Sequence, residues 1–243
     1  MDSAAKQKKV FHVFEEIAEN YDAANERISL GFQRSWKRML LRRVMRHTAA
    51  ADRTGFLDVC CGTGDITVAL AEQNPEAAVT GIDFSPAMLE VAKRKGRKLD
   101  NITWLCADAE ELPFEDNVFQ AATISFGLRN TTDYRKVLTE MIRVVRPGGW
   151  IYVLESCIVD NPVIRPFYMV YFCGLMPFIG GGRKHFREYR WLWQSTEKFL
   201  RQKDLLTLFQ KTGLRSVAGR SRMFGACVLV EGQKAVTGSD GSV

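Results

Sequence analysis

The spacing of apolar and polar residues changes near residue 55. From Val10 to Ile17, apolar residues recur every three or four positions, which predicts an amphipathic helix preceded by frayed residues 1–9. A second helical pattern covers about Trp36–Met45 and carries basic residues on its other faces. We therefore expect residues 1–50 to form a helical unit that differs from the rest of the chain.

From about residue 56, short apolar runs alternate with helical patterns. Ser85 and Pro86 are typical of a helix start, and Pro147-Gly148-Gly149 is typical of a helix stop. The alternation indicates βαβ units, so the predicted fold class is α/β: a Rossmann-like, mostly parallel seven-stranded sheet with helices on both faces. The expected strands are Phe56–Cys60, Ala78–Asp83, Ile102–Ala107, Val118–Ser125, Trp150–Cys157, Leu214–Ser221 and Gly225–Val230, and the expected helices are Ile66–Ala71, Ser85–Lys95, Asp133–Val145 and Leu205–Thr212.

Residues 161–200 interrupt this alternation with an aromatic-rich insertion. Its uncharged stretch, Pro166–Gly182, has seventeen residues and is broken by Gly174 and Pro177, which makes it too short and too interrupted to span a membrane. A buried core helix is one interpretation of the stretch, and an apolar wall beside a ligand is the other. The last residues, 236–243, are expected to be disordered.

The composition is that of an ordinary globular protein. The chain has 243 residues, of which 46% are hydrophobic and 26% charged, so one domain with a sizeable core is expected. The formal net charge of +6 suits an anionic ligand or a membrane surface. A nucleic-acid-binding protein usually carries denser basic patches, and we expect no nucleic-acid partner.

Cysteines and histidines give little support to a metal site. The six cysteines form no C-x-x-C pair, and the chain has only three histidines, so no metal is expected. The N-terminal residues are charged throughout, unlike a secretory signal peptide. We therefore expect the protein in the reducing cytoplasm.

A glycine turn comes directly after the first expected strand of the sheet. Gly62-Thr63-Gly64 lets the backbone approach a ligand closely, and the helix behind it offers free N–H groups. Asp83 ends the second strand, where an acidic side chain can accept hydrogen bonds from both hydroxyls of a ribose. The turn alone is equally compatible with a tight connection that binds nothing, but together with Asp83 it predicts an adenosine ligand.

Two residues decide which adenosine ligand is expected. The third small residue of the dinucleotide fingerprint is replaced by Thr67, and Asp65 lies where it would repel a phosphate. A carboxylate beside the loop favours a cationic or zwitterionic ligand. S-adenosylmethionine has this character, whereas NAD does not, and S-adenosylmethionine is the predicted cofactor.

With these motifs, the chain resembles the class I S-adenosylmethionine-dependent methyltransferases, and more narrowly the menaquinone/ubiquinone biosynthesis C-methyltransferase family. The resemblance covers roughly residues 10–230, and its most specific run is Ser125-Phe126-Gly127-Leu128-Arg129-Asn130. The Cys60-Cys61-Gly62-Thr63 form of the turn is more similar to the menaquinone branch. The other matching runs are Val13–Asn25, Trp36-Lys37-Arg38, Leu57–Asp65, Asp108–Phe114, Arg146–Gly149 and Glu188–Ser195.

The resemblance implies a set of cofactor-binding residues. Thr63 would contact the cofactor at the turn, Asp83 the ribose, and Asp108 and Ala109 the adenine, through a carboxylate acceptor and a backbone N–H donor. Leu112 and Phe114 either pack on the adenine or belong to the core. The full predicted set is Gly62, Thr63, Gly64, Asp83, Asp108, Ala109 and Ser125.

The resemblance also implies methyl transfer to a ring carbon of a reduced, prenylated naphthoquinone. The guanidinium of Arg129 would stabilise the oxyanion beside that carbon, and Asn130 would orient a hydroxyl or a water. Arginine is a poor base, so Tyr21 and Asp22 are candidates for proton removal. A helix cap is the alternative role of Asp22.

The implied organisation has three parts: a helical lid (1–50), a methyltransferase domain (51–235) and, within it, an insertion that covers the acceptor (161–200). The insertion would form a wall for the prenyl chain and contact the inner face of the cell membrane peripherally. A homodimer is compatible with this organisation. The alternative acceptors are a ubiquinone precursor or another small aromatic compound, and the alternative class is a non-catalytic S-adenosylmethionine-binding membrane adapter.

Overall fold

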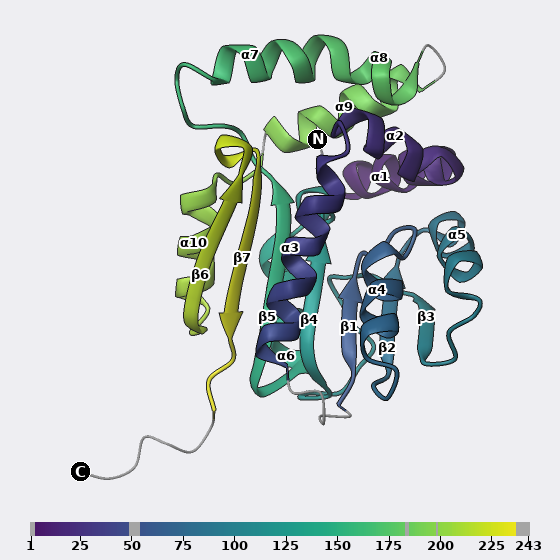
Figure 1. Ribbon diagram of the computed structural model, residues 1–243, viewed down its shortest axis with the longest axis vertical. Coiled ribbons are helices and arrows are strands. Elements are labelled where there is room, and N and C mark those ends of the chain that lie inside the picture. The colour runs from purple at the N-terminus through teal and green to yellow at the C-terminus, as the bar shows by residue number, and fades with distance from the viewer. Residues whose placement is uncertain (1–2, 49–53, 183–184, 198, 237–243) are drawn as a thin grey trace.

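A seven-stranded sheet forms the centre of the molecule. The computed structural model describes residues 3–48, 54–182, 185–197 and 199–236. The strand order is β3-β2-β1-β4-β5-β7-β6, and the first five are parallel, whereas β7 runs antiparallel to both of its neighbours (Figure 1). The predicted α/β class and its seven strands are confirmed. The strands are β1 (Phe56–Val59), β2 (Val79–Asp83), β3 (Ile102–Cys106), β4 (Phe119–Ser125), β5 (Val145–Ser156), β6 (Arg215–Arg222) and β7 (Cys227–Gln233).

Helices cover both faces of this sheet because successive strand residues point to opposite sides. On one face, Leu57 and Ala122 pack with α6 and α10. On the other, Phe56 and Ala121 pack with α3 and α4. The helices beside the sheet are α3 (Phe32–His47), α4 (Asp65–Gln73), α5 (Pro86–Gly96), α6 (Tyr134–Val144) and α10 (Gln202–Lys211).

A third layer lies across the carboxyl ends of the parallel strands, at the top of Figure 1. It combines N-terminal helices with the insertion, and its members share a core around Val13, Ile17 and Tyr189. No helix in the described ranges combines the length and apolar composition that crossing a membrane requires. The elements of this layer are α1 (Ser3–Ile17), η1 (Ala18–Asn20), α2 (Tyr21–Ile28), α7 (Arg165–Val170), the π-helical η3 (Tyr171–Leu175), α8 (Met176–Gly181) and α9 (Phe186–Glu197).

Two local expectations are corrected. Residues 3–9 are not frayed but belong to α1, because the Lys6 ammonium donates to the Thr131 carbonyl. Pro147-Gly148-Gly149 lies inside β5 rather than between a helix and a strand, since a register shift against β4 accommodates it.

The helix start at Ser85 is confirmed, because the Ser85 hydroxyl accepts from the Met88 N–H at 3.2 Å. The tail predicted for 236–243 lies outside the described residues from 237 onward.

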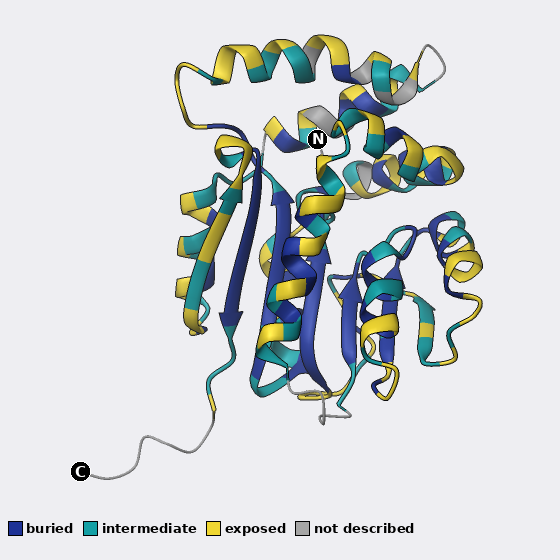
Figure 2. Cartoon of the chain, viewed as in Figure 1, coloured by how far each residue is buried: buried dark blue, intermediate teal, exposed yellow. Residues whose placement is uncertain are grey.

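The insertion is neither a buried helix nor a loop. Figure 2 shows the sheet mostly buried, whereas α7 and α8 at the top carry many exposed positions. Phe167, Val170 and Phe178 are more than half exposed, while Phe172 and Met176 of the same segment face inward. The core-helix interpretation is therefore wrong, and the segment has two apolar sides.

Candidate functional site

The glycine turn has the strained backbone that its sequence suggests. Cys60, Gly62 and Gly64 have φ values of +52°, +56° and +82°, in the left-handed region that favours glycine. A Cβ on Gly64 would lie 2.6 Å from a ring carbon of Trp104, so only glycine packs there. A Cβ on Gly62 would meet no atom within 4 Å, which leaves one side of the turn open to a ligand.

Asp83 connects this turn to the next strand. Its Oδ2 accepts from the Gly62 N–H at 2.9 Å, and its Oδ1 accepts from the Ser85 N–H at 2.9 Å. Burial raises the pKa of Asp83 to about 6, although the backbone N–H donors oppose the shift. Among the described residues no cation pairs with this carboxylate, and each oxygen keeps acceptor capacity for a hydroxyl.

The first cavity lies beyond the ends of β1, β2, β3 and β4 and has a volume of about 690 Å³. Four of the predicted cofactor residues line it: Asp83, Asp108, Ala109 and Ser125. Leu112 and Phe114 do not; Leu112 is buried in the core, and the Phe114 ring packs edge-to-face on Phe119. The structure thus assembles the predicted ribose and adenine residues and settles Leu112 and Phe114 as core.

The side chain of Thr63 does not line the first cavity. Its hydroxyl donates to Asp22 of α2 at 2.6 Å and accepts from Lys95 of α5 at 3.1 Å, and Lys95 also pairs with Asp22. Thr63 lines a small neighbouring space together with Ser125 and Tyr21. The N-cap residue of α2 is Asn20, whose side chain makes no cap hydrogen bond, and Asp22 lies in the first turn of the helix. Thr63 and Asp22 thus join the turn to the N-terminal helices.

The carboxylate of Asp65, from which the sequence predicted a cationic or zwitterionic ligand, is itself ion-paired. Lys37 lies 2.7 Å and Lys95 2.5 Å from its carboxylate oxygens. The two ammonium groups offset the charge of Asp65. The argument from this carboxylate is therefore weaker than the sequence suggested, whereas the buried Asp83 has no cationic partner among the described residues.

The helix α1 is held over the first cavity by polar contacts at both of its ends. Near its start, the Gln7 side chain donates to Asp108 Oδ2 at 3.2 Å. Near its end, Glu15 Oε1 accepts from the Ser85 hydroxyl at 2.6 Å and from the Ala87 N–H at 3.0 Å. The N-terminal segment therefore closes the cavity on the side away from the sheet.

A second cavity, of about 700 Å³, adjoins the first. It lies among α2, α3, α9 and the insertion, and Tyr21 and Phe126 line both cavities. Its walls are mainly apolar, with Ile28, Trp36 and Phe172 among them. A flat apolar ring with a polar edge suits such a space.

Arg129 lines the second cavity from the short helix η2 (Leu128–Asn130). Its side chain is only 10% exposed, and its Nη1 donates to the Phe126 carbonyl at 2.7 Å and to the carboxylate of Glu155. Its Nε is buried and has no hydrogen-bond partner within the described residues. A solvated arginine is therefore ruled out, and one strong donor remains unused.

Glu155 is a further residue of the site that the sequence analysis did not identify. It is fully buried on β5, ion-paired with Arg129, and also accepts from the backbone N–H of Arg129 at 3.2 Å. The available signal was a single carboxylate within the apolar run of a central strand, since a buried acid there needs a cationic partner. The pair compensates both charges and holds the guanidinium in place.

Asn130, next to Arg129, turns toward the first cavity instead. It is 6% exposed; its amide donates to the Phe126 carbonyl at 3.3 Å, and its Oδ1 accepts from the Ser195 hydroxyl at 3.0 Å. The two neighbouring candidates therefore serve different cavities. Asn130 also connects η2 to α9 through Ser195.

Tyr21 lies at the junction of the two cavities. Burial raises the pKa of its hydroxyl to about 12, although the nearby charge of Arg129 opposes this. The hydroxyl is therefore protonated at neutral pH and can donate a hydrogen bond. Asp22, the other candidate for proton removal, lines neither of the two cavities.

One cluster of metal-ligating side chains lies outside both cavities. Ligand atoms of Glu16, His185 and Glu188 come within 4.8 Å of one another on α1 and near α9. None of the three lines the first or the second cavity, and Glu16 and Glu188 line a separate surface depression. The cluster therefore takes no part in the site described above.

Comparisons with known proteins agree with this geometry. A model of the ubiE/COQ5 methyltransferase family matches residues 2–234. The demethylmenaquinone methyltransferase of Staphylococcus aureus (strain JH9) is 42% identical over 235 residues, which cover 96% of this chain and 96% of that protein. These matches confirm the family resemblance drawn from the sequence, together with the predicted enzyme class and its methyl donor, S-adenosylmethionine.

Solved structures confirm the methyltransferase fold at low sequence identity. A SAM-dependent methyltransferase from Thermotoga maritima, described as a possible histamine N-methyltransferase, has a TM-score of 0.63 at 17% identity and is covered over 99% of its length by 93% of this chain. A SAM-dependent methyltransferase from Aquifex aeolicus has a TM-score of 0.56 at 17% identity, with 96% of this chain and 98% of that chain covered. The Rossmann-like arrangement is thus shared well beyond close relatives.

Proposed function

Because this chain belongs to the ubiE/COQ5 methyltransferase family, we propose that it transfers a methyl group from S-adenosylmethionine to a ring carbon of demethylmenaquinol, which gives menaquinol. The name of its Staphylococcus aureus relative supports this acceptor. The observation that carries the proposal is that Arg129 lines a mainly apolar cavity beside the first one and that its buried Nε has no hydrogen-bond partner among the described residues.

The first cavity fits the methyl donor. The open side of Gly62 admits a ligand close to the backbone, and the carboxylate of Asp83 has acceptor capacity for ribose hydroxyls. Asp108 and Ala109 would hold the adenine, and Ser125 lies at the junction with the glycine turn. When bound, S-adenosylmethionine supplies a methyl group on a positively charged sulfur.

Arg129 is assigned to the acceptor. A quinol ring carbon becomes nucleophilic when the hydroxyl on its neighbouring carbon loses a proton. The guanidinium stabilises the resulting oxyanion through its unused Nε–H, and the hydroxyl proton passes to water because arginine is a poor base. The ring carbon then takes the methyl group as the sulfur–methyl bond breaks, which leaves neutral S-adenosylhomocysteine. The hydrogen on that carbon moves as a proton to the ring oxygen, which restores the quinol. Glu155 keeps the guanidinium fixed, so this stabilisation requires little reorganisation.

The other predicted site residues support the donor cavity and Arg129. Tyr21 donates a hydrogen bond at the junction of the cavities, and Asn130 shapes the donor side. Asp22 and Thr63 hold α2 against the glycine turn, while Gln7 and Glu15 hold α1, so that the two helices form a lid. By excluding water and aligning sulfur, methyl and carbon, the lid contributes to the rate without entering the chemistry.

A direct assay tests the proposal. Purified protein is incubated with methyl-labelled S-adenosylmethionine and a short-chain demethylmenaquinol kept reduced, and the expected product is the ring-methylated quinol identified by mass spectrometry. A host that lacks the protein should accumulate demethylmenaquinone. Label in a ubiquinone precursor instead would favour the alternative acceptor, and cofactor binding without any transfer would favour the non-catalytic adapter.

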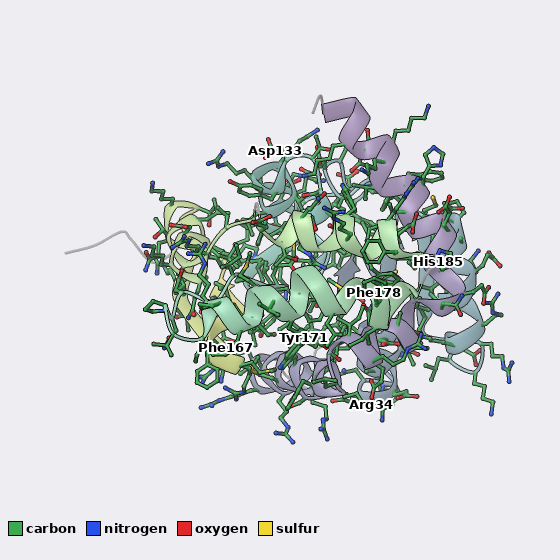
Figure 3. All side chains as sticks on the ribbon, turned by 90° about the horizontal axis from the view of Figure 1, so that it is seen from above. Arg34, Asp133, Phe167, Tyr171, Phe178 and His185 are labelled. Carbon is green, nitrogen blue, oxygen red and sulfur yellow. The ribbon has the colours of Figure 1, made fainter. Side chains whose placement is uncertain are left out.

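We further propose that the insertion contacts the membrane from which a prenylated quinol must be taken. Its outer stripe is exposed and apolar, while Phe172 and Met176 on its inner side line the acceptor cavity. Figure 3, seen from above, shows the segment with Phe167, Tyr171 and Phe178 crossing this face of the molecule. Exposed Arg165, between Val163 and Phe167 of the stripe, suits anionic headgroups. The outer stripe comprises Val163, Phe167, Val170, Leu175 and Phe178, which are between 52% and 75% exposed.

Vesicle binding tests this contact. The double substitution Phe167→Ser with Phe178→Ser should weaken sedimentation with phosphatidylglycerol-containing vesicles by about tenfold or more, because each buried ring contributes about 1.5–3 kcal/mol. Val118→Ser, on an exposed residue just before β4, is the matched control. Equal binding of the double variant and the wild type would contradict the contact, and so would binding lost equally in the control.

A further inference from the structure

Besides Arg129, another side chain that lines the second cavity, the proposed acceptor cavity, carries a buried polar atom without a partner among the described residues. Tyr189 of α9 is 1% exposed and lines the second cavity, and within the described residues its hydroxyl makes no hydrogen bond. The same cavity holds the unpartnered Nε of Arg129. Two buried donors without a partner among the described residues thus belong to side chains that line the same mainly apolar cavity from two different elements.

Such a hydroxyl is unusual, because a buried polar group normally has a partner and is costly without one. Two other tyrosines of the insertion follow the rule. The Tyr171 hydroxyl donates to the Ile28 carbonyl at 2.8 Å, and the Tyr168 hydroxyl donates to the Cys157 carbonyl at 3.3 Å. The exception at Tyr189 therefore points to a ligand atom rather than to loose packing.

The acceptor proposed above carries two oxygens on opposite sides of one ring. One lies beside the carbon that receives the methyl group, and the other lies beside the carbon that bears the prenyl chain. The first needs a charged partner because it becomes an oxyanion, whereas the second stays a neutral hydroxyl throughout. A guanidinium and a phenol match this pair of requirements.

We propose that the Tyr189 hydroxyl hydrogen-bonds the second ring oxygen of the acceptor, so that Tyr189 selects 1,4-dihydroxy rings over rings with a single hydroxyl. This inference rests on the proposed function. It divides recognition between Arg129, which acts on the reacting side, and Tyr189, which acts on the remote side. A ring without the remote oxygen leaves the Tyr189 hydroxyl buried and unpaired.

A cycle of two enzymes and two acceptors tests the assignment. Wild type and Tyr189→Phe are each assayed with the short-chain demethylmenaquinol and with the analogue in which the remote hydroxyl is replaced by hydrogen. The wild type should prefer the dihydroxy acceptor by about 10- to 30-fold in kcat/KM, the scale of one buried hydrogen bond. Tyr189→Phe should lose this preference, chiefly through a higher KM for the dihydroxy acceptor.

Thermal unfolding of the same proteins excludes a structural role. Tyr189→Phe removes an unpaired hydroxyl, so its midpoint should equal or exceed that of the wild type. Tyr171→Phe, the matched control, removes a satisfied hydrogen bond and should lower the midpoint while leaving acceptor preference unchanged. A lowered midpoint for Tyr189→Phe together with an unchanged preference would overturn the inference.

The two proposals fail in different ways. If the wild type methylates neither acceptor, the proposed function is wrong. If it methylates the dihydroxy acceptor and Tyr189→Phe retains the full preference, only the assignment of Tyr189 is wrong.

Discussion

The two cavities differ in how their polar groups are satisfied before any ligand binds. In the first, the carboxylate of Asp83 already accepts two backbone N–H groups, and Asp108 accepts from Gln7. In the second, Arg129 Nε and Tyr189 Oη are both buried without partners among the described residues. The first cavity is therefore a preformed cradle that a ligand completes, whereas the second is a mainly apolar space in which a ligand must supply acceptor atoms.

The cavities also differ in the parts of the chain that build them. The first is formed chiefly by the loops that come after β1, β2, β3 and β4, with α1 as a cover. The second draws on α2, α3, α9 and the insertion, and its lining extends from Tyr21 to Ala226. Substitutions of residues that line only the second cavity can therefore change the acceptor without disturbing the binding of the methyl donor.

The largest expected effect separates chemistry from donor binding. Arg129→Lys keeps the charge but loses the planar fork, and turnover should fall by about 10²–10³, the scale of removing one oxyanion donor. The affinity for S-adenosylmethionine should change by less than about threefold, because Arg129 does not line the first cavity. Single-turnover methylation and calorimetric titration measure the two quantities. Near-normal turnover would show that Arg129 has only a structural role. A loss of S-adenosylmethionine affinity in parallel with turnover would show that the two cavities do not act separately.

A smaller effect is expected from a substitution in the first cavity, where the methyl donor binds. Asp83→Ala should weaken S-adenosylmethionine binding by about 10- to 100-fold, because charge-assisted bonds to ribose are worth about 1.5–3 kcal/mol. Asp116→Ala, at an exposed surface ion pair with Arg143, is the control and should bind normally. Calorimetry on folded protein decides the matter, and unchanged affinity in Asp83→Ala would remove Asp83 from the donor site.

The smallest effect is a pH dependence of donor binding. The pKa of Asp83 is raised by burial to about 6, so its carboxylate is ionised above that pH and protonated below it. Affinity for S-adenosylmethionine should therefore be steady above about pH 7 and fall about tenfold by about pH 5. For the free protein the sign is reversed: the folded state holds this proton more tightly than the unfolded chain, so the contribution of Asp83 to stability decreases as the pH rises from about 4 to 6.

The variant Asp83→Asn provides the control for this dependence, since it cannot ionise. Its donor affinity should be nearly independent of pH over the same range. An equal slope in Asp83→Asn would assign the titration to another group, such as Asp58, whose pKa burial also raises to about 6.

Much of the fold was predictable from the sequence, because each strand carries its own apolar run and each glycine or proline signal acts on its own neighbours. The insertion was harder to interpret, since an apolar segment reads the same whether its two sides meet protein or solvent. The expectation of a frayed start was wrong for residues 3–9 for a similar reason. Contacts with Thr131 and Asp108, more than 100 residues away, hold this segment in a helix.

The sequence by itself determined the glycine turn and the position of Asp83 at a strand end, because these depend on backbone geometry within a few residues and on the parallel order of the strands. Only the tertiary structure decided that Arg129 is paired with Glu155, that Asn130 faces the other cavity, and that Tyr189 is left without a partner among the described residues. Burial and hydrogen bonding are properties of residues that meet from distant parts of the chain. No local pattern can therefore specify which donors remain unsatisfied, and in this protein those donors define the proposed acceptor site.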